Sequence, residues 1–108
     1  MAKGYTSIQH EMMISYMEAR LVAEGRVNTT DATNLFGIAR VNALKIIGEW
    51  QKRSELPVYE SSEKAWIPLH ADRRSKLFGS INDAAKYMRL VERVYRETAQ
   101  AIKAWESA

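Results

Sequence analysis

Several residue types that carry chemistry are scarce in this sequence of 108 residues. It has no cysteine, which excludes a disulfide framework and a thiolate nucleophile, and its two histidines, His10 and His70, lie too far apart in sequence to predict a metal site. Its five glycines are scattered singly, which excludes a phosphate-binding glycine loop. No Ser/His/Asp order and no pair of carboxylates predicts a catalytic cleft. We therefore expect no enzyme, no metal and no cofactor.

Long apolar runs are also missing. No stretch approaches the roughly 20 apolar residues of a membrane span, and no early run is long enough for the apolar region of a signal peptide. We therefore expect a cytoplasmic protein without a membrane partner, and no feature indicates a small-molecule ligand. The length suffices for one compact domain with a modest core and at most one appendage. The net charge of +3 fits a polyanionic partner without proving one.

The stretch from 27 to 51 predicts two helices joined by a tight turn. Apolar residues of the first helix recur three to four residues apart, at Ala32, Leu35 and Phe36. Thr30 is expected to cap this helix with its hydroxyl oxygen, and the carboxylate of Asp31 lies next to it at the positive end of the helix dipole. Gly37 follows the last apolar position, where a residue without Cβ adopts the left-handed conformation at little cost. Ile38 is expected to fill the turn as a buried plug.

The second helix, from about Arg40, has two chemically different faces. Its apolar face holds Ala43, Ile46, Ile47 and Trp50, and its other face holds Arg40, Asn42, Leu44, Lys45, Glu49 and Lys52. This division is typical of a helix-turn-helix, because the second helix must anchor itself in the core while it offers polar and basic side chains to the major groove. From 26 to 53 the basic residues Arg26, Arg40, Lys45, Lys52 and Arg53 stand against Asp31 and Glu49. A helix, a glycine turn and a helix also occur in many all-α proteins that never contact DNA.

A longer helix is expected before this unit. A capping box formed by Thr6 and Gln9 begins it, and Gly25 ends it. One apolar stripe consists of Met13, Ile14, Met17 and Leu21, and a second consists of Ile8, Met12, Tyr16, Ala19 and Ala23. So wide an apolar arc predicts contacts on two sides, with the helix-turn-helix on one side and the C-terminal helix or another subunit on the other.

After Arg53 the apolar pattern changes from helical to alternating. From 56 to 68 it predicts a β-hairpin with the pairs Glu60 and Ala65, Tyr59 and Trp66, Val58 and Ile67, and Pro57 and Pro68. Both strands are expected to stop at the prolines, because proline cannot donate a hydrogen bond to a ladder. A small hairpin directly after a recognition helix is a wing. Its tip, residues 61–64, is expected to lie along a sugar-phosphate backbone, or else the hairpin only covers the core.

The C-terminal part is expected to be a basic connector followed by a long helix. The connector, from 70 to 78, holds Arg73, Arg74 and Lys76, which are either solvated or close to phosphates. Ser80 and Asp83 give a second capping signal. Apolar residues then recur at the a/d spacing of a coiled coil: Ile81, Ala84, Met88, Val91, Tyr95, Thr98, Ile102 and Trp105. Such a helix spans roughly 39 Å, so we expect part of it to pack on a second copy or on the first helix of a partner.

Four segments together resemble the N-terminal winged-helix domain of WYL-domain transcriptional repressors, particularly those that guard bacterial phage-defence loci. They are EGRVNTTD before the first motif helix, LFGIAR across the turn, EWQ at the end of the recognition helix, and VYESSEKAWI in the hairpin. The resemblance implies a homodimer on an inverted-repeat operator, with the residues around Ala39, Arg40, Val41, Asn42 and Lys45 in the groove.

This sequence departs from the family in two ways. Only one further helix is expected after the winged helix, so we expect the effector-sensing WYL domain to be absent. Leu44 also stands at an outward position where related domains usually carry a polar residue. We expect Leu44 either to pack on a thymine methyl group or to be buried by a slight rotation of the helix.

We therefore expect a mainly α protein with a small β-hairpin, in which 1–78 form a winged helix-turn-helix and 79–108 form a coiled-coil-like dimerisation helix. The expected function is sequence-specific binding of double-stranded DNA by a homodimeric transcriptional regulator, most simply a repressor. Base contacts are expected from Arg40, Val41, Asn42, Leu44 and Lys45, and backbone contacts from Thr29, Thr30, Ala39, Lys52, Arg53, Ser62 and Lys64. The eight residues at the a/d spacing are the expected dimer contacts.

Alternatives remain open for individual residues and for the whole protein. Thr29 and Thr30 can serve only as helix caps, and Lys52 and Arg53 can serve only to solvate a helix end. The protein can instead be a winged helix used for protein contact, such as an inhibitor encoded by a phage or mobile element. It can also be a DNA-packaging or recombination accessory, since these join a helix-turn-helix to an oligomerising helix.

Overall fold

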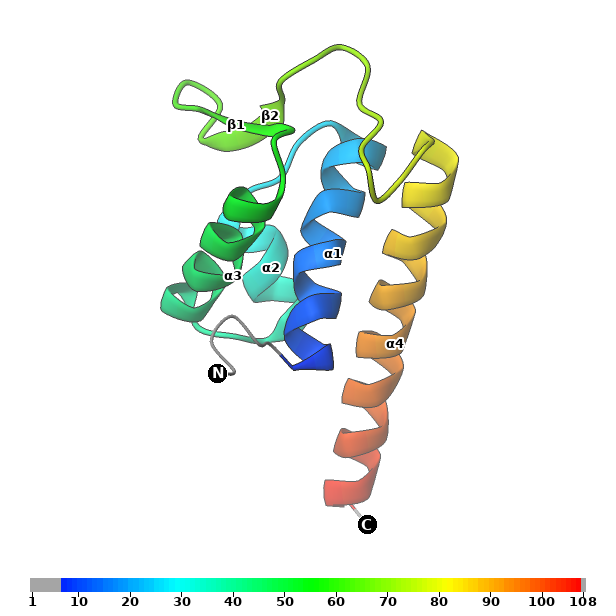
Figure 1. Cartoon of the computed structure of the whole chain (residues 1–108). Helices are drawn as coiled ribbons and strands as arrows, with labels where there is room; N and C mark the ends of the chain where they lie inside the picture. Colours follow the sequence, from blue (N-terminus) through cyan, green and yellow to red (C-terminus); the bar gives the residue numbers. More distant parts are fainter. Residues whose placement is uncertain (1–6, 108) are drawn as a thin grey trace.

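The computed structural model describes residues 7–107 of the chain. Its elements follow in the order α1 (Ile8–Glu24), α2 (Thr29–Phe36), α3 (Arg40–Arg53), β1 (Pro57–Glu60), β2 (Ala65–Pro68) and α4 (Ile81–Ser107), as Figure 1 shows. The predicted mainly α fold with one small hairpin and a long C-terminal helix is confirmed. Between residues 7 and 107, no helix combines the length and the apolar character that crossing a membrane requires.

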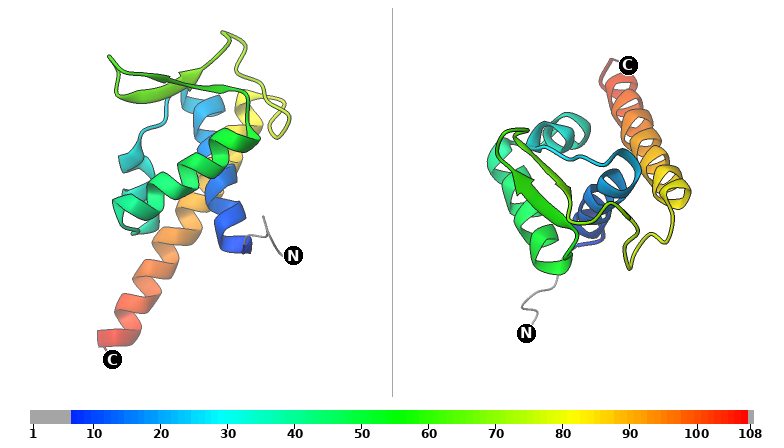
Figure 2. Two further views of the ribbon diagram at one scale, coloured as in Figure 1. Left: turned by 60° about the vertical axis from the view of Figure 1, so that its left-hand side comes forward. Right: turned by 90° about the horizontal axis from the view of Figure 1, so that it is seen from above.

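α1 is the central helix of the fold. Figure 2 shows α3 on one side of α1 and α4 on the other, and both pack against it. The core side chains of α1 are Met13, Ile14, Tyr16, Met17, Ala19, Leu21 and Val22. The predicted contact on two sides is confirmed, and α4 of the same chain covers the second side. One stripe position was wrong, since Ile8 is 87% exposed because the neighbouring helices do not cover that side of the first turn.

The amino end of α1 is capped one residue later than the sequence indicated. The Ser7 Oγ accepts a hydrogen bond from the His10 N–H at 3.1 Å, so Ser7 is the N-cap. The capping box predicted at Thr6 falls on a residue outside the described range. At the other end, Gly25 has a left-handed conformation with φ 78°, as predicted.

An arginine from the connector also closes the carboxyl end of α1. The Arg73 guanidinium donates to the carbonyl oxygens of Val22 and Ala23 at 2.9 and 3.3 Å. These are carbonyls of the last turn, which lack a partner within the helix and lie at the negative end of its dipole. Arg73 is therefore a structural clamp between distant segments. The prediction that it is solvated or touches phosphates was wrong.

α2 and the turn after it differ from the prediction at the cap. Asn28 is the N-cap, because its Oδ1 accepts from the Asp31 N–H at 3.1 Å while Asp31 Oδ2 accepts from the Asn28 N–H at 2.8 Å. The N-cap predicted at Thr30 was wrong, since Thr30 lies inside the helix. Gly37 ends α2 with φ 65°, as predicted, and Ile38 packs against the core but is only partly buried.

α3 is anchored by the predicted apolar face. Its buried residues are Ala43, Ile46, Ile47 and Trp50. Leu44 is 43% exposed, so the helix is not rotated in the way that would bury it. Of the two alternatives for Leu44, burial by rotation of the helix is excluded, and contact with a thymine methyl group stays a prediction.

β1 and β2 form the predicted hairpin with the predicted register. The Cα partners are Pro57 and Pro68, Val58 and Ile67, Tyr59 and Trp66, and Glu60 and Ala65. The rings of Tyr59 and Trp66 meet edge to face with centres 4.9 Å apart. This cross-strand pair supports the short ladder.

α4 is the longest helix, and its amino half belongs to the core. The Ser80 Oγ accepts from the Asp83 N–H at 3.0 Å, which confirms the predicted cap. The helix runs antiparallel to α1, as the colours of Figure 1 show. Ala84, Met88 and Val91 are buried at 0%, 7% and 2% exposure. Burial of each larger side chain contributes about 1.5–3 kcal/mol to folding.

The part of the predicted dimer seam from Ala84 to Val91 is therefore covered within the chain. Ala84, Met88 and Val91 were wrong as contacts to a second copy, because α1 of the same chain covers them. Tyr95 packs on Phe36 with ring centres 4.9 Å apart. Residues on both sides of the domain boundary expected between 78 and 79 therefore belong to one core. The remaining seam residues are exposed, namely Ile81, Thr98, Ile102 and Trp105.

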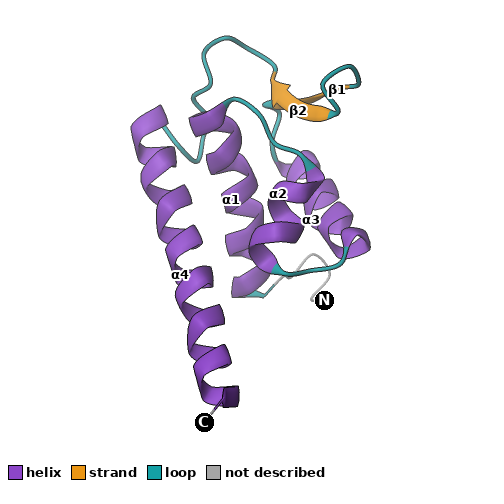
Figure 3. Ribbon diagram, turned by 180° about the vertical axis from the view of Figure 1, so that it is seen from behind, coloured by secondary structure: helices purple, strands orange, loops and turns teal. Residues whose placement is uncertain are grey.

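A polar network fixes α4 to α1 and α2. The Tyr16 hydroxyl donates to Glu92 Oε2 at 2.8 Å and accepts from Arg20 Nη1 at 3.1 Å. The Nε of Arg20 lies 3.1 Å from Asp31 Oδ2. Burial, together with the hydrogen bond to Glu92, raises the pKa of Tyr16 well above its ordinary value. Beyond this network the carboxyl half of α4 extends past the other helices, as Figure 3 shows.

Candidate nucleic-acid interface

The outward face of α3 lies opposite its buried face. Spacings of three and four residues return to the same side of a helix, so Val41, Lys45, Gly48 and Lys52 form one line along this side. Arg40, Asn42 and Leu44 flank the line at the amino end. We call these seven residues the α3 face. All but Gly48 are exposed, so the structure brings the five predicted base-contact residues together on one accessible surface.

The amino end of α3 is open. Ala39 occupies the N-cap position with extended backbone and makes no side-chain hydrogen bond to the first turn. The first N–H groups of a helix lack intrahelical partners, and the peptide dipoles leave partial positive charge there. In α2 the side chains of Asn28 and Asp31 fill the equivalent position. An anion such as a phosphate therefore fits the amino end of α3 better than that of α2.

Gly48 lies in the middle of the α3 face, and packing within the chain does not explain why this residue is a glycine. A Cβ built on Gly48 would meet nothing within 4 Å beyond the adjoining helix backbone, and no positive φ demands glycine there. Glycine inside a helix costs about 1 kcal/mol of stability relative to alanine. The protein therefore loses stability at position 48, where a larger side chain would contact only another molecule.

The hairpin projects on the α3 side of the molecule, away from α4 (Figures 1 and 2). Val27, in the link between α1 and α2, pairs with Trp66 through N–H to oxygen hydrogen bonds of 3.0 and 2.8 Å. Arg26 next to it donates to the Glu63 carbonyl at 3.1 Å and lies 3.4 Å from the Glu63 carboxylate. The link between α1 and α2 therefore sets the position of the hairpin tip.

Lys64 is the cation of the hairpin tip. Its φ is 52°, and among the described residues no other non-glycine has a positive φ. The Lys64 N–H donates to the Ser61 carbonyl at 3.2 Å, which closes the turn. The side chain of Lys64 is exposed and forms no ion pair within the described part of the chain. It fits the predicted role of a phosphate contact.

Three predicted backbone contacts are engaged within the chain. The Arg53 guanidinium pairs with Glu11 on α1 at 2.7 Å, which turns it toward α1 and away from the α3 face. The Ser62 hydroxyl donates to the Glu60 carboxylate at 2.8 Å, and the Thr30 hydroxyl donates to the side chain that caps α2. These contacts compete with a phosphate for the polar hydrogens of Arg53, Ser62 and Thr30, and their predicted role as phosphate donors stays a prediction.

The other predicted backbone contacts remain accessible to different degrees. The side chain of Lys52 is 78% exposed, and its ammonium lies 3.7 Å from Glu49. An exposed pair of this kind contributes little, so it leaves the lysine able to exchange partners. Thr29 is partly buried in the first turn of α2, and Ala39 offers only its backbone. The surface is not uniformly basic, since Glu60 and Glu63 lie near Lys64 on the hairpin.

Sequence reasoning missed the roles of three residues that shape this surface. Gly48 could have been found as a glycine seven residues after Val41, on the polar side of a predicted helix. Val27 and Arg26 had no comparable signal, because a single bridging residue shows no alternation. Their contacts come from residues 66 and 63, which lie far along the chain.

Two further observations bear on the chemistry of this chain. In the part that the structure describes, no three histidine, aspartate or glutamate side chains gather where they could hold a metal ion. No protein-family model matches the sequence, and no curated protein is significantly similar to it. Function is therefore inferred from the α3 face and the hairpin alone.

Proposed function

We propose that this protein is a winged helix-turn-helix regulator of transcription that binds double-stranded DNA with sequence preference, most simply as a repressor. The observation that carries the proposal is the α3 face, an exposed polar and basic surface on a helix whose opposite face is fully anchored. A recognition helix requires this combination, because it must enter a groove without moving relative to its own domain. The open amino end of α3 adds N–H donors for a phosphate.

The side chains of the α3 face suit base edges in the major groove. Arg40 matches the two acceptors of guanine, and Asn42 matches the acceptor and donor of adenine. Lys45 is a further donor to guanine. Val41 and Leu44 are exposed at 60% and 43% and offer apolar contact to thymine methyl groups. With these contacts, the residues that determine base preference all lie in the amino half of α3.

Phosphate contacts come from fewer residues than the sequence indicated. Lys52, at the carboxyl end of the α3 face, and Lys64, at the hairpin tip, are both exposed cations. Neither contact reads a base, so both add affinity for any sequence. The hairpin then serves as the wing of the domain.

We propose further that two copies pair through the free part of α4. Apolar residues recur on a stripe beside the one that packs on α1: Leu90, Val94, Ala101 and Trp105. Leu90 and Val94 are 54% and 43% exposed, and Trp105 is 84% exposed. Pairing of two such stripes would remove this surface from water. A symmetric pair would present two α3 faces to half-sites of an inverted repeat.

The test is selection of DNA fragments from a random pool, followed by sequencing. We expect an inverted repeat whose half-sites lie roughly 34 Å apart, one turn of DNA, or a multiple of that distance. Arg40→Ala is expected to lose preference at one base pair of each half-site. Arg89→Ala is the matched control, because Arg89 is an exposed arginine on α4. Recovery of random sequence would contradict the proposal.

A second candidate function is a winged helix used only for protein contact. The observation in its favour is the exposed apolar stripe of α4, which a different protein could cover as well as a second copy. Absence of DNA binding at low salt would favour this candidate. DNA binding without any sequence preference would instead favour a packaging or recombination accessory.

A further inference from the structure

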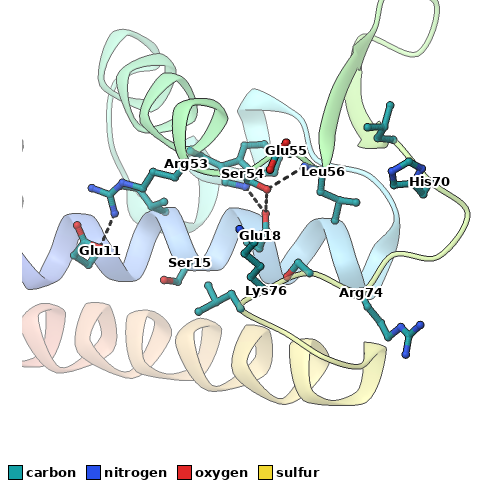
Figure 4. A pocket seen from close by; sticks show the side chains of 15 residues that line it. Glu11, Ser15, Glu18, Arg53, Ser54, Glu55, Leu56, His70, Arg74 and Lys76 are labelled. Atoms are coloured by element: carbon teal, nitrogen blue, oxygen red, sulfur yellow. Dashed lines mark hydrogen bonds and ion pairs between the residues drawn. The ribbon is translucent and has the colours of Figure 1, made fainter.

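A cavity lies between α1, the carboxyl end of α3 and the connector after β2 (Figure 4). Its volume is about 600 Å³, within the range of sites for small molecules. Part of its wall is apolar, from Ile14, Leu56, Leu69 and Leu77. Leu69 and Leu77 are 54% and 56% exposed. A ligand with an apolar body would cover side chains that water now contacts.

Glu18 at this cavity is unusual, because it is the one charged side chain that is buried among the described residues, at 6% exposure. Its Oε1 accepts from the Trp50 indole N–H at 2.7 Å and from the Ser54 hydroxyl at 2.8 Å. Both donors are neutral and both bonds fall on the same oxygen. Oε2 therefore remains for another partner, and no ion pair joins the buried carboxylate to a cation among the described residues.

The cations around the cavity do not balance Glu18. Arg53 pairs with Glu11, as the dashed line in Figure 4 shows. Arg74 pairs with Asp72 at 2.6 Å and points away from the cavity. The exposed side chain of Lys76 extends toward Glu18 in Figure 4, but no ion pair joins the two in the part of the chain that the structure describes. A cation from outside the chain would meet an unpaired carboxylate.

We propose that this cavity binds a small organic cation, with a protonated amine on the Glu18 carboxylate and an apolar body over Leu69 and Leu77. A hydrogen bond between an ammonium group and a carboxylate is stronger than one between neutral groups, and burial strengthens it further. The same cavity disfavours an anion of equal size, because that anion would lie beside Glu18. The inferred ligand class is therefore an amine with an aromatic or aliphatic body.

The cavity also touches the joint between α3 and the hairpin. Its lining includes Trp50 and Arg53 of α3, then Ser54 and Leu56, which lead into β1. The Ser54 Oγ that donates to Glu18 also accepts from the Leu56 N–H at 3.3 Å. A ligand on Glu18 would contact the segment that sets the angle of the hairpin relative to α3. An effect on DNA affinity follows from this contact, and that consequence alone rests on the proposed function.

The binding experiment uses the full chain without DNA and follows the Trp50 indole N–H by ¹H–¹⁵N NMR. The probes are phenethylammonium, the neutral 2-phenylethanol and the anion 3-phenylpropanoate, which share an aromatic body. We expect the ammonium to shift the Trp50 signal and to bind at least about tenfold more tightly than the alcohol, as one hydrogen bond to a charged group would give. Equal affinities for the three probes, or no shift at about 10 mM ammonium, would overturn the proposal.

Two variants identify the carboxylate. Glu18→Gln keeps acceptor oxygen for Trp50 and Ser54 but removes the charge, so the preference for the ammonium over the alcohol is expected to disappear. Glu55→Gln is the matched control at the exposed rim and keeps the preference. Should Glu18→Gln not fold, Leu69→Lys removes apolar contact for every probe and adds a positive charge, so it is expected to weaken the ammonium more than the alcohol. Unchanged preference in Leu69→Lys, or in a folded Glu18→Gln, would contradict the proposal.

DNA binding is measured separately, with and without phenethylammonium at saturation. A protein that binds the ammonium but no DNA would leave the site intact and would contradict only the proposed function. A protein that binds DNA but shows no preference among the probes would contradict only the site.

Discussion

Replacement of Gly48 separates the stability of the protein from its function. Gly48 lies inside α3, has no positive φ, and has open space where a Cβ would point. Gly48→Ala is therefore expected to raise the free energy of unfolding by about 1 kcal/mol, the difference in helix propensity. In a domain of this size that gain raises the melting temperature by about 4–8 °C, which thermal unfolding followed by circular dichroism measures.

A larger side chain at the same position should affect DNA binding in the opposite direction. Methionine has nearly the helix propensity of alanine, so Gly48→Met is expected to keep most of the gain in stability. Its side chain would project from the centre of the α3 face toward the groove. We expect the affinity for the selected operator to fall at least about tenfold, which corresponds to about 1.4 kcal/mol. Fluorescence anisotropy of labelled operator measures this change.

The control for Gly48→Met is Gln51→Met on the same helix. Gln51 is exposed but lies about a quarter of a turn away from the line through Val41 and Lys52. This variant is expected to bind DNA normally. Loss of stability in Gly48→Ala would refute the inference of open space, and normal operator binding by Gly48→Met would refute the assignment of the α3 face.

The remaining predictions test other parts of the molecule. Lys64→Gly removes the cation from the hairpin tip and suits its positive φ, so affinity should fall alike for all DNA sequences without loss of stability. If Lys52 and Lys64 supply the phosphate contacts, the log–log salt dependence of a dimer should have a slope of about −4, and a flat titration would exclude this role. Val91→Glu buries a charge in the core and should unfold the chain, whereas Trp105→Glu should give folded monomers in light scattering. Because folding raises the pKa of Tyr16 above its unfolded value of 10.0, its contribution to stability is complete below about pH 10 and is lost as pH rises further. Tyr16→Phe should reduce this alkaline loss in urea unfolding.

Local patterns predicted the elements that depend on near neighbours. The hairpin register followed from alternation and from the two prolines, since both signals refer to residues that face each other across one short turn. The buried face of α3 followed from the helical period, because four apolar residues at that spacing can only be buried together. Gly37 and Gly25 marked helix ends through a backbone conformation that few other residues adopt.

Patterns could not identify which partner covers an apolar stripe. The spacing through Met88 and Val91 is the same whether a helix packs on its own chain or on a second copy. Only the tertiary arrangement showed that α1 covers this part of α4. The cap of α2 was ambiguous for a local reason, since Asn28, Thr29 and Thr30 all have suitable oxygens. Asn28 is the cap because Asp31 then lies three residues on and completes the reciprocal hydrogen bond.

Contacts between distant residues engage part of the predicted site. Arg53 was expected at a phosphate, but Glu11 lies 42 residues away in sequence and no local pattern joins them. The cavity was equally hidden, because Glu18, Ser54 and Leu77 come from three segments. No local pattern shows which exposed side chain a distant residue will bind, as Glu11 binds Arg53.

The continuity of α4 has a consequence for the spacing of DNA sites. Its 27 residues contain neither proline nor glycine, so the helix has no built-in hinge between the half that is fixed in the core and the half that projects. In a dimer joined at the projecting ends, α4 would hold the two α3 faces at a fixed distance and orientation. One base pair added between half-sites turns one of them by roughly 34–36° about the DNA axis. A helix without a hinge cannot follow that turn. The protein should therefore prefer one spacing between half-sites and not a range of spacings.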